Sequence, residues 1–387
     1  MEAYLDNAST TRPLESVRSI MKETLDACYG NPSSMHAKGM EAEQYIRHAK
    51  EIIASTLKAE QKEIIFTSGG TESNNMALIG CAAANWRQGK HIITTKIEHP
   101  SVHNPIIFLE GQGYEVTYLS VDKNGYVDLE ELESSIRPDT ILVSVMYVNN
   151  EIGTCEKIEE IARIIKGKNE KTLFHVDAIQ AYGKYRIFPK KLGIDLLSIS
   201  GHKLHGPKGI GVLYIRDKVK VKPIIHGGGQ QNNMRSGTEN VPGIAGIGKA
   251  AEEIYKEHKE KTEHLYELKE HFIHEVMKIE GVTVNGVTEI PIRETAPHVV
   301  SVSFAGIRAE VLLHALEERH VYVSSGSACA SNHPQLSGTL QAIGVKKELL
   351  DATIRFSFSV ETKREEVDYA LQQLNELLPV LRRFTRH

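Results

Sequence analysis

Between residues 60 and 215, short apolar runs alternate with stretches of helical periodicity, and this alternation constrains the fold more than any other feature. Several runs are apolar throughout, which is typical of strands that helices cover on both faces. The order strand, helix, strand predicts a mostly parallel sheet with right-handed crossovers. The predicted strands are residues 63–67, 91–95, 115–119, 140–145, 172–176, 195–200 and 211–215.

We expect the last of these strands to pair with its predecessor as an antiparallel hairpin. After it, the alternation of strands and helices ends. Residues 241–279 predict one long, charged helix, and shorter strands follow it. We therefore expect an α/β fold with two domains. The larger covers residues 14–257 and contains a seven-stranded, mostly parallel sheet. The smaller α+β domain combines residues 1–13 with 258–387.

The composition excludes several classes of protein. The chain has 387 residues, 41% of them hydrophobic, and a net charge of −4. Lys and Arg are scattered, so we expect no direct binding of nucleic acid. No apolar stretch approaches the roughly 18–20 residues that span a bilayer, and the N-terminal residues do not resemble a signal peptide, so we expect no membrane association.

Metal-ligand spacing is missing from the sequence. The four cysteines lie far apart, which favours a reducing cytoplasm over a disulfide framework. His258, His264, His271 and His274 mostly miss the i, i+4 spacing of a helical metal site. We expect these histidines on a solvated helix face, and we predict no metal site.

Lys203 is the first candidate for chemistry. It follows the predicted strand 195–200 and precedes a glycine-punctuated turn. Desolvation at the buried end of a strand weakens the proton affinity of an amine, and a neutral amine is a nucleophile toward an aldehyde. The alternative is an ordinary surface lysine, because lysines are rarely buried. The neighbouring motifs favour the first interpretation.

Asp177 ends the predicted strand 172–176, and Gln180 follows one helical turn later. A carboxylate at this position can hold the protonated nitrogen of a pyridine ring, which makes a pyridoxal ring an electron sink. The alternative is a helix N-cap, since Asp commonly begins helices. A strand-end acid and a strand-end lysine together favour a cofactor site.

A third motif joins the strand 63–67 to an alanine-rich helix. Residues 67–74 read Thr-Ser-Gly-Gly-Thr-Glu-Ser-Asn. Glycines let the backbone approach a ligand, and the N–H groups at the start of a helix suit a phosphate. Such turns are common in α/β proteins, and this one matches neither the Walker pattern nor GxGxxG.

Together these motifs resemble the class V branch of the fold-type I pyridoxal-phosphate enzymes. Two further runs resemble those of the NifS/IscS-type cysteine desulfurases: residues 324–329 (Ser-Ser-Gly-Ser-Ala-Cys) and residues 234–240 (Met-Arg-Ser-Gly-Thr-Glu-Asn). The resemblance extends over essentially the whole chain. The other matching segments are residues 4–11, 30–34, 98–99, 149–153 and 354–357.

The resemblance implies roles around the ring of pyridoxal 5'-phosphate. Lys203 would bind the cofactor aldehyde covalently and later act as the base at the substrate α-carbon. Asp177 would keep the ring nitrogen protonated, and Gln180 would donate to the ring oxygen. His99 would stack on the ring and transfer protons, although a histidine that merely begins a helix is the alternative. Asn150 would lie near both ring and substrate.

The resemblance also implies how the phosphate is held. Thr71, Ser200 and His202 would contact it, and Gly70 would allow a close approach of the backbone. Thr238 would reach the phosphate of a neighbouring subunit, which implies a homodimer.

The substrate and its sulfur are assigned in the same way. Arg355 is the expected partner of the substrate α-carboxylate, because its planar guanidinium binds carboxylates in bidentate fashion. Asn31 would assist it. Cys329 lies among small residues, which suits a loop that collects sulfur as a persulfide; a small buried cysteine is the alternative.

The resulting expectation is a cytoplasmic enzyme that converts L-cysteine to L-alanine and passes sulfur to an acceptor, such as an iron–sulfur scaffold or a tRNA-thiolation protein. Alternatives with the same fold are a selenocysteine lyase and a cysteine-sulfinate desulfinase, neither of which needs the thiol of Cys329. An aminotransferase, or a non-catalytic sulfur carrier, is a more distant alternative.

Overall fold

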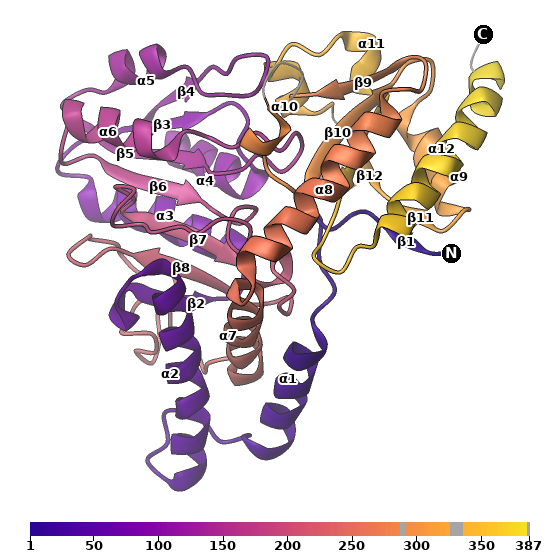
Figure 1. Ribbon diagram of the computed structural model, residues 1–387. Coiled ribbons are helices and arrows are strands. Elements are labelled where there is room, and N and C mark those ends of the chain that lie inside the picture. Colours follow the sequence, from indigo (N-terminus) through magenta and orange to yellow (C-terminus); the bar gives the residue numbers. More distant parts are fainter. Residues whose placement is uncertain (287–290, 326–335, 385–387) are drawn as a thin grey trace.

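A seven-stranded sheet forms the centre of the larger part of the computed structural model, which describes residues 1–286, 291–325 and 336–384 (Figure 1). The strand order is β2-β8-β7-β6-β5-β3-β4. β8 is antiparallel to both neighbours, and the other pairs are parallel. The predicted sheet and its terminal hairpin are therefore confirmed. The strands are β2 Ile64–Thr67, β3 His91–Thr95, β4 Glu115–Leu119, β5 Thr140–Met146, β6 Leu173–Asp177, β7 Leu196–Ser200 and β8 Gly211–Ile215.

Helices cover both faces of this sheet (Figure 1). All seven residues of β5 are buried, and neighbouring side chains enter different cores: Leu142 packs with α3 and α4, and Val143 packs with α2, α6 and α7. Burial on both faces explains why the predicted strands lack polar alternation. The helices are α1 Glu15–Ala27, α2 Ala37–Leu57, α3 Gly70–Asn85, α4 Pro100–Gly111, α5 Leu129–Ser135, α6 Ile158–Lys168 and α7 Val241–Tyr255.

A smaller antiparallel sheet, in the order β12-β13-β10-β9, has its own hydrophobic core. Ala3 and Leu5 pack into this core, which supports assigning residues 1–13 to the smaller domain; the boundaries 14–257 and 258–387 remain a prediction. The elements are β1 Ala3–Tyr4, α8 His258–Val276, β9 Val282–Asn285, β10 Val299–Phe304, α9 Ala309–Glu317, β11 Val321–Tyr322, β12 Ser324–Ser325, α10 Gly338–Ala342, α11 Lys347–Leu350, β13 Thr353–Ser357 and α12 Arg364–Phe384. Single 3₁₀ turns occur at Gln61–Glu63, Gly201–Lys203 and Ile292–Glu294.

The prediction of one helix over residues 241–279 is wrong. α7 ends at Tyr255 and α8 begins at His258, because Glu257 adopts the left-handed conformation with φ of 54°. The hydroxyl of Tyr255 donates to the carbonyl of Tyr185 at 2.9 Å and accepts from the N–H of Gly183 at 3.1 Å. These bonds fix the end of α7 against the larger domain, so the chain turns before α8 enters the smaller one.

The expected solvated histidine face is wrong for His258, whereas His264 and His271 are partly exposed. His258 is buried and stacks on Tyr255, His264 bonds to the carbonyl of Thr362, and His271 bonds to Asp368. Within the described ranges, no three His, Cys, Asp or Glu side chains gather as metal ligands would. None of the helices in those ranges has both the length and the apolar character that crossing a membrane requires.

Candidate active site

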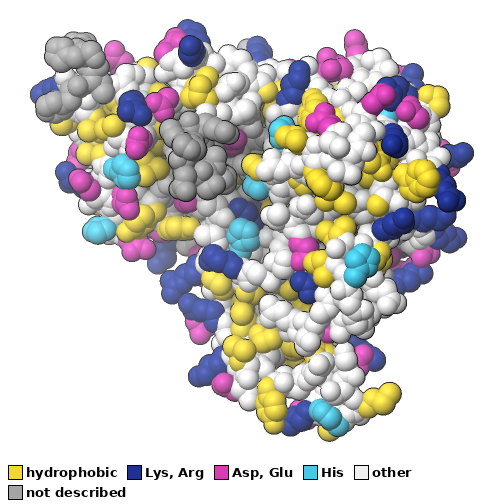
Figure 2. Space-filling view, turned by 180° about the vertical axis from the view of Figure 1, so that it is seen from behind, with side chains coloured by type: hydrophobic (Ala, Val, Ile, Leu, Met, Phe, Trp, Pro, Cys, Tyr) yellow, Lys and Arg dark blue, Asp and Glu magenta, His cyan; other side chains and the backbone are white. Residues whose placement is uncertain are grey.

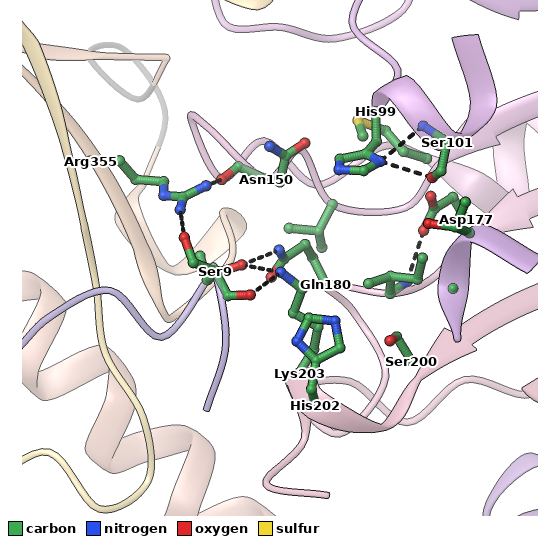
Figure 3. A pocket seen from close by; sticks show the side chains of 16 residues that line it. Ser9, His99, Ser101, Asn150, Asp177, Gln180, Ser200, His202, Lys203 and Arg355 are labelled. Atoms are coloured by element: carbon green, nitrogen blue, oxygen red, sulfur yellow. Dashed lines mark hydrogen bonds between the residues drawn. The ribbon is translucent and has the colours of Figure 1, made fainter. Parts of the chain in front are cut away.

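A cavity of about 260 Å³ lies at the carboxyl ends of β5, β6 and β7 (Figure 3). The starts of α3 and α4 border it from the larger domain, and β13 borders it from the smaller one. Ligands of parallel α/β sheets bind at this edge. The lining residues are Ala8, Ser9, Gly70, Thr71, His99, Ser101, Met146, Val148, Asn150, Asp177, Ile179, Gln180, Ser200, His202, Lys203 and Arg355.

Lys203 extends from the turn after β7 into this cavity. Its Nζ donates to the carbonyls of Ala8 and, at 2.7 Å, Ser9. Gln180 Nε2 also donates to the carbonyl of Ala8, at 2.9 Å. The N-terminal segment thus reaches the amine of Lys203 and accepts two hydrogen bonds from it.

Asp177 ends β6, and its carboxylate is buried at the edge of the cavity. Burial raises the pKa of this carboxylate. The hydrogen bonds from the backbone N–H of Ile179 and from the side chain of Asn74 lower it, and so do the electrostatic interactions with His99 and Lys203. One oxygen accepts from Ile179 N at 2.9 Å and the other from Asn74 Nδ2 at 2.8 Å. The bond to Ile179 closes a turn, and no helix begins among the described residues between β6 and β7, so the helix N-cap alternative is wrong. The remaining lone pairs of this carboxylate can accept from a cationic donor in the cavity.

His99 is the N-cap of α4 and also lines the cavity. Its Nδ1 accepts from the N–H of Ser101 at 3.1 Å, so the neutral ring carries its proton on Nε2. Burial lowers the pKa of His99, and Lys203 and Arg355 lower it further, whereas Asp177 raises it. A neutral imidazole near Lys203 can therefore accept or release a proton.

One end of the cavity suits an anion. Ser200 Oγ is buried and has no hydrogen-bond partner among the described residues. Gly70 begins α3, and a Cβ there would lie 3.3 Å from Ser200 Cβ and 2.2 Å from Ile179 Cδ1. Thr71 and His202 complete this end, with the N–H groups of the first turn of α3. These donors can bind a phosphate group.

Arg355 and Asn150 lie at the opposite end (Figure 3). Arg355 is a buried residue of β13, and its Nη1 donates to the carbonyl of Asn150 at 2.9 Å. A buried guanidinium at this position can bind a carboxylate.

Two predicted residues that the structure describes do not lie in this cavity. Asn31 is exposed in the loop between α1 and α2, and Thr238 is exposed in the loop before α7. Neither lines the cavity of its own chain. Cys329 lies outside the described residues.

The sequence did not point to several side chains that organise the site. Asn74 Nδ2 donates to both Asp177 and, at 2.9 Å, Ser101 Oγ, which in turn bonds to His99 Nδ1 at 2.8 Å. This chain of bonds joins α3, α4 and β6. The position of Asn74 one turn after Gly70 is the only signal for it in the sequence. Ser9 gave no such signal.

Fold and cavity together define a two-domain α/β protein with a lysine, a buried acid and an anion-binding helix start at one edge of its sheet. The family model for aminotransferase class-V matches residues 3–370, and the chain belongs to that family.

Curated relatives and solved structures agree with this membership. The chain is 47% identical over 382 residues to a cysteine desulfurase IscS from Dictyoglomus turgidum, covering 98% of this chain and 95% of the relative. A solved NifS-like protein superimposes with a TM-score of 0.92 at 40% identity, covering 98% of this chain and all of that one. SspA, solved in complex with cysteine, superimposes with a TM-score of 0.81 at 34% identity, covering 93% of this chain and all of that one.

Glu98 precedes His99, and its burial makes the free energy of unfolding depend on pH. Its Oε1 accepts from Met146 N and Thr95 Oγ1, both at 2.9 Å, and its Oε2 is buried without a partner among the described residues. Burial raises the pKa of Glu98 to about 8. The folded protein therefore holds a proton on Glu98 that the unfolded chain releases above the ordinary pKa of 4.5.

We predict that Glu98→Gln flattens the pH dependence of stability. The contribution of Glu98 is fully present below pH 4.5 and is lost as the pH rises toward 8, by roughly 5 kcal/mol. Urea unfolding of both proteins at several pH values measures this loss. The exposed Glu51→Gln substitution should leave the slope unchanged. Parallel pH profiles for wild type and Glu98→Gln would contradict the prediction.

Proposed function

We propose that this protein is a pyridoxal-phosphate-dependent cysteine desulfurase, which converts L-cysteine to L-alanine and transfers the sulfur through Cys329. The observation that carries the proposal is the convergence of Lys203, Asp177, His99 and Arg355, from four distant segments, on one cavity. The likeness to cysteine desulfurases over nearly the whole chain supports it.

The residues of the cavity fit pyridoxal phosphate. The unpartnered Ser200 Oγ and the backbone at the start of α3, where Gly70 lies, suit its phosphate, which Thr71 and His202 would also contact. Asp177 would hold the protonated ring nitrogen, since a cation beside a buried carboxylate offsets the desolvation that raises its pKa.

Other residues would fix the position of the ring. Lys203 would bind the aldehyde covalently, and Gln180 would donate to the ring oxygen. His99 would stack on the ring, and Asn150 would lie beside ring and substrate. All four line the cavity.

The cofactor, when bound, withdraws electrons from the α-carbon of an attached amino acid. The protein supplies everything else. Arg355 would bind the α-carboxylate and orient the substrate. Lys203, within the same cavity, would remove the α-proton and return it, and the neutral His99 would move a proton at the substrate.

Cys329 distinguishes a desulfurase from an aminotransferase. Its thiolate would attack the substrate sulfur, form a sulfur–sulfur bond and break the carbon–sulfur bond. The electron pair of the broken bond stays with carbon, which takes up protons and leaves as alanine. The sulfur remains on Cys329 as a persulfide. An aminotransferase would leave this thiol without a role.

The first test is spectroscopic. Lys203→Ala should abolish both the visible absorbance of the Lys203-bound cofactor and the formation of alanine from cysteine, because no other amine is proposed to bind the aldehyde. Lys208→Ala, which changes an exposed lysine five residues later, is the matched control and should retain both. Normal turnover in Lys203→Ala would rule out the proposed site.

Cys329→Ala separates cysteine desulfuration from the related reactions. We expect the variant to keep the visible absorbance but to lose persulfide transfer to an added thiol acceptor. Mass spectrometry after incubation with cysteine should show added sulfur on Cys329 of the wild type. Selenocysteine and cysteine sulfinate serve as comparison substrates: full activity on them, with cysteine activity also unaffected, would favour the selenocysteine lyase or desulfinase alternative.

We also propose that the protein works as a homodimer in which Thr238 reaches the phosphate of the second subunit. Asn31 would likewise act at the second subunit, since both residues are exposed and lie outside their own cavity. Figure 2 shows hydrophobic side chains at the narrow end formed by α1 and α2. The exposed residues there are Leu25, Tyr29, Met35 and Met40, and a second copy could cover them.

Analytical ultracentrifugation tests the dimer. The wild type is expected to sediment as a dimer, and Thr238→Ala should stay dimeric but bind the cofactor more weakly, since it removes one phosphate donor. A fully active monomer would refute the proposal.

The partner that receives the sulfur would be a protein with an acceptor thiol, such as an iron–sulfur scaffold or a tRNA-thiolation protein. Because the proposed persulfide requires a reduced thiol at Cys329, we place the reaction in the cytoplasm.

A further inference from the structure

Arg355 is a buried cation whose charge is already compensated within the chain. Its side chain is 4% exposed, and Nη2 donates to Asp6 Oδ1 at 3.0 Å and to Ser9 Oγ at 2.6 Å (Figure 3 shows the Ser9 contact). Nη1 donates to the carbonyl of Asn150. Nε is buried and has no partner among the described residues.

Asp6 is the carboxylate that forms an ion pair with Arg355 within the described part of the chain. Burial raises the pKa of Glu151 and so opposes its ionisation, although its electrostatic interaction with Arg355 lowers the pKa. Asp6 is bridged to Ser357, two residues after Arg355 on β13, and Ser9 Oγ donates to its Oδ1 at 2.7 Å. Asp6 is thus fixed beside the guanidinium as its counter-ion.

The geometry of a guanidinium makes this contact relevant to substrate. A carboxylate binds arginine in bidentate fashion across either Nε and Nη2 or Nη1 and Nη2. Both arrangements use Nη2. Since Asp6 and Ser9 already accept its two hydrogens, a bidentate carboxylate must displace one of them or share a hydrogen with it.

The two members of the ion pair differ in their access to water. Asp6 has 20% of its side chain exposed, so its carboxylate can regain hydration when it is displaced. Arg355 is nearly inaccessible and needs an anion at all times, because an uncompensated buried charge is costly. A substrate carboxylate can therefore replace Asp6 at Arg355. When the substrate leaves, Asp6 pairs with Arg355 again and stabilises the substrate-free protein.

We propose that Asp6 is an internal competitor of the substrate carboxylate, which stabilises the substrate-free protein and limits its affinity for amino acids. The inference rests on the proposed role of Arg355 as the carboxylate site. It gives Asp6 two effects of opposite sign: its removal lowers stability and raises affinity. Removal of a residue that only supports the shape of the site would lower both the stability of the protein and its affinity for amino acids.

The test compares two ligands on the holoenzyme of wild type and Asp6→Asn. L-Alanine carries the carboxylate, and L-alaninamide replaces it with a neutral amide. Binding is followed by the visible absorbance of the bound cofactor. Asp6→Asn should bind L-alanine about tenfold more tightly, because the competing charge is gone, whereas binding of L-alaninamide should change less than about twofold. Without ligand, the variant should melt at a lower temperature than wild type.

Asp351→Asn is the matched control, because it removes the carboxylate of an exposed Arg–Asp pair with Arg308 in the smaller domain. It should change neither ligand affinity nor melting temperature appreciably. Ser9→Ala is the second variant, and it keeps the test decisive if Asp6→Asn does not fold. It removes the neutral acceptor from Nη2 and should tighten L-alanine binding about twofold, with L-alaninamide unaffected.

Weaker or unchanged L-alanine binding in Asp6→Asn, or weaker binding in Ser9→Ala, would overturn the proposal. Arg355→Lys should weaken L-alanine binding but not L-alaninamide binding. If Arg355→Lys does not weaken L-alanine binding, Arg355 is not the carboxylate site and the proposal for Asp6 is wrong. Alanine formation from cysteine is measured separately, so the desulfurase proposal is judged on its own result.

Discussion

The parallel pairing of β6 with β7 is the constraint on which the site depends. Its register places Asp177 opposite Ser198, so the two strands end at the same edge of the sheet. The acid at the end of β6 and the lysine after β7 therefore face one cavity. The pairing in turn requires helices on both faces, because both strands are buried on both sides.

Burial determines the charge state of the groups around this cavity. The pKa of His99 is lowered and that of Asp177 is raised, and desolvation is the largest cause of both shifts. The same effect lowers the pKa of His202 to about 4. Neutral imidazoles beside Lys203 and Arg355 limit the positive charge that the site must hold before it receives an anionic ligand.

The sequence predicted what depends on local pattern. Apolar runs located the seven strands, and the strand-end positions of Asp177 and Lys203 identified two groups that the structure brings to one cavity. It could not predict the break at Glu257, because the end of α7 is fixed by bonds between Tyr255 and residues 183 and 185, which are distant in the sequence. Contacts between distant segments, such as Ser9 with Arg355, have no local signature. Asn31 and Thr238 lie away from the cavity of their own chain, and only an assembly could assign their partners.

The joining of residues 3–9 to the far end of the chain affects the order in which the protein is completed. β1 pairs with β11, and Asp6, Asn7 and Ala8 bond to or pair with residues of β13. On the ribosome, residues 3–9 must wait for partners that are made about 350 residues later. The larger sheet can form earlier, yet the cavity gains its wall from the smaller domain only after β13 has been made. A nascent chain arrested before β13 would therefore present Lys203 without its guanidinium counterpart.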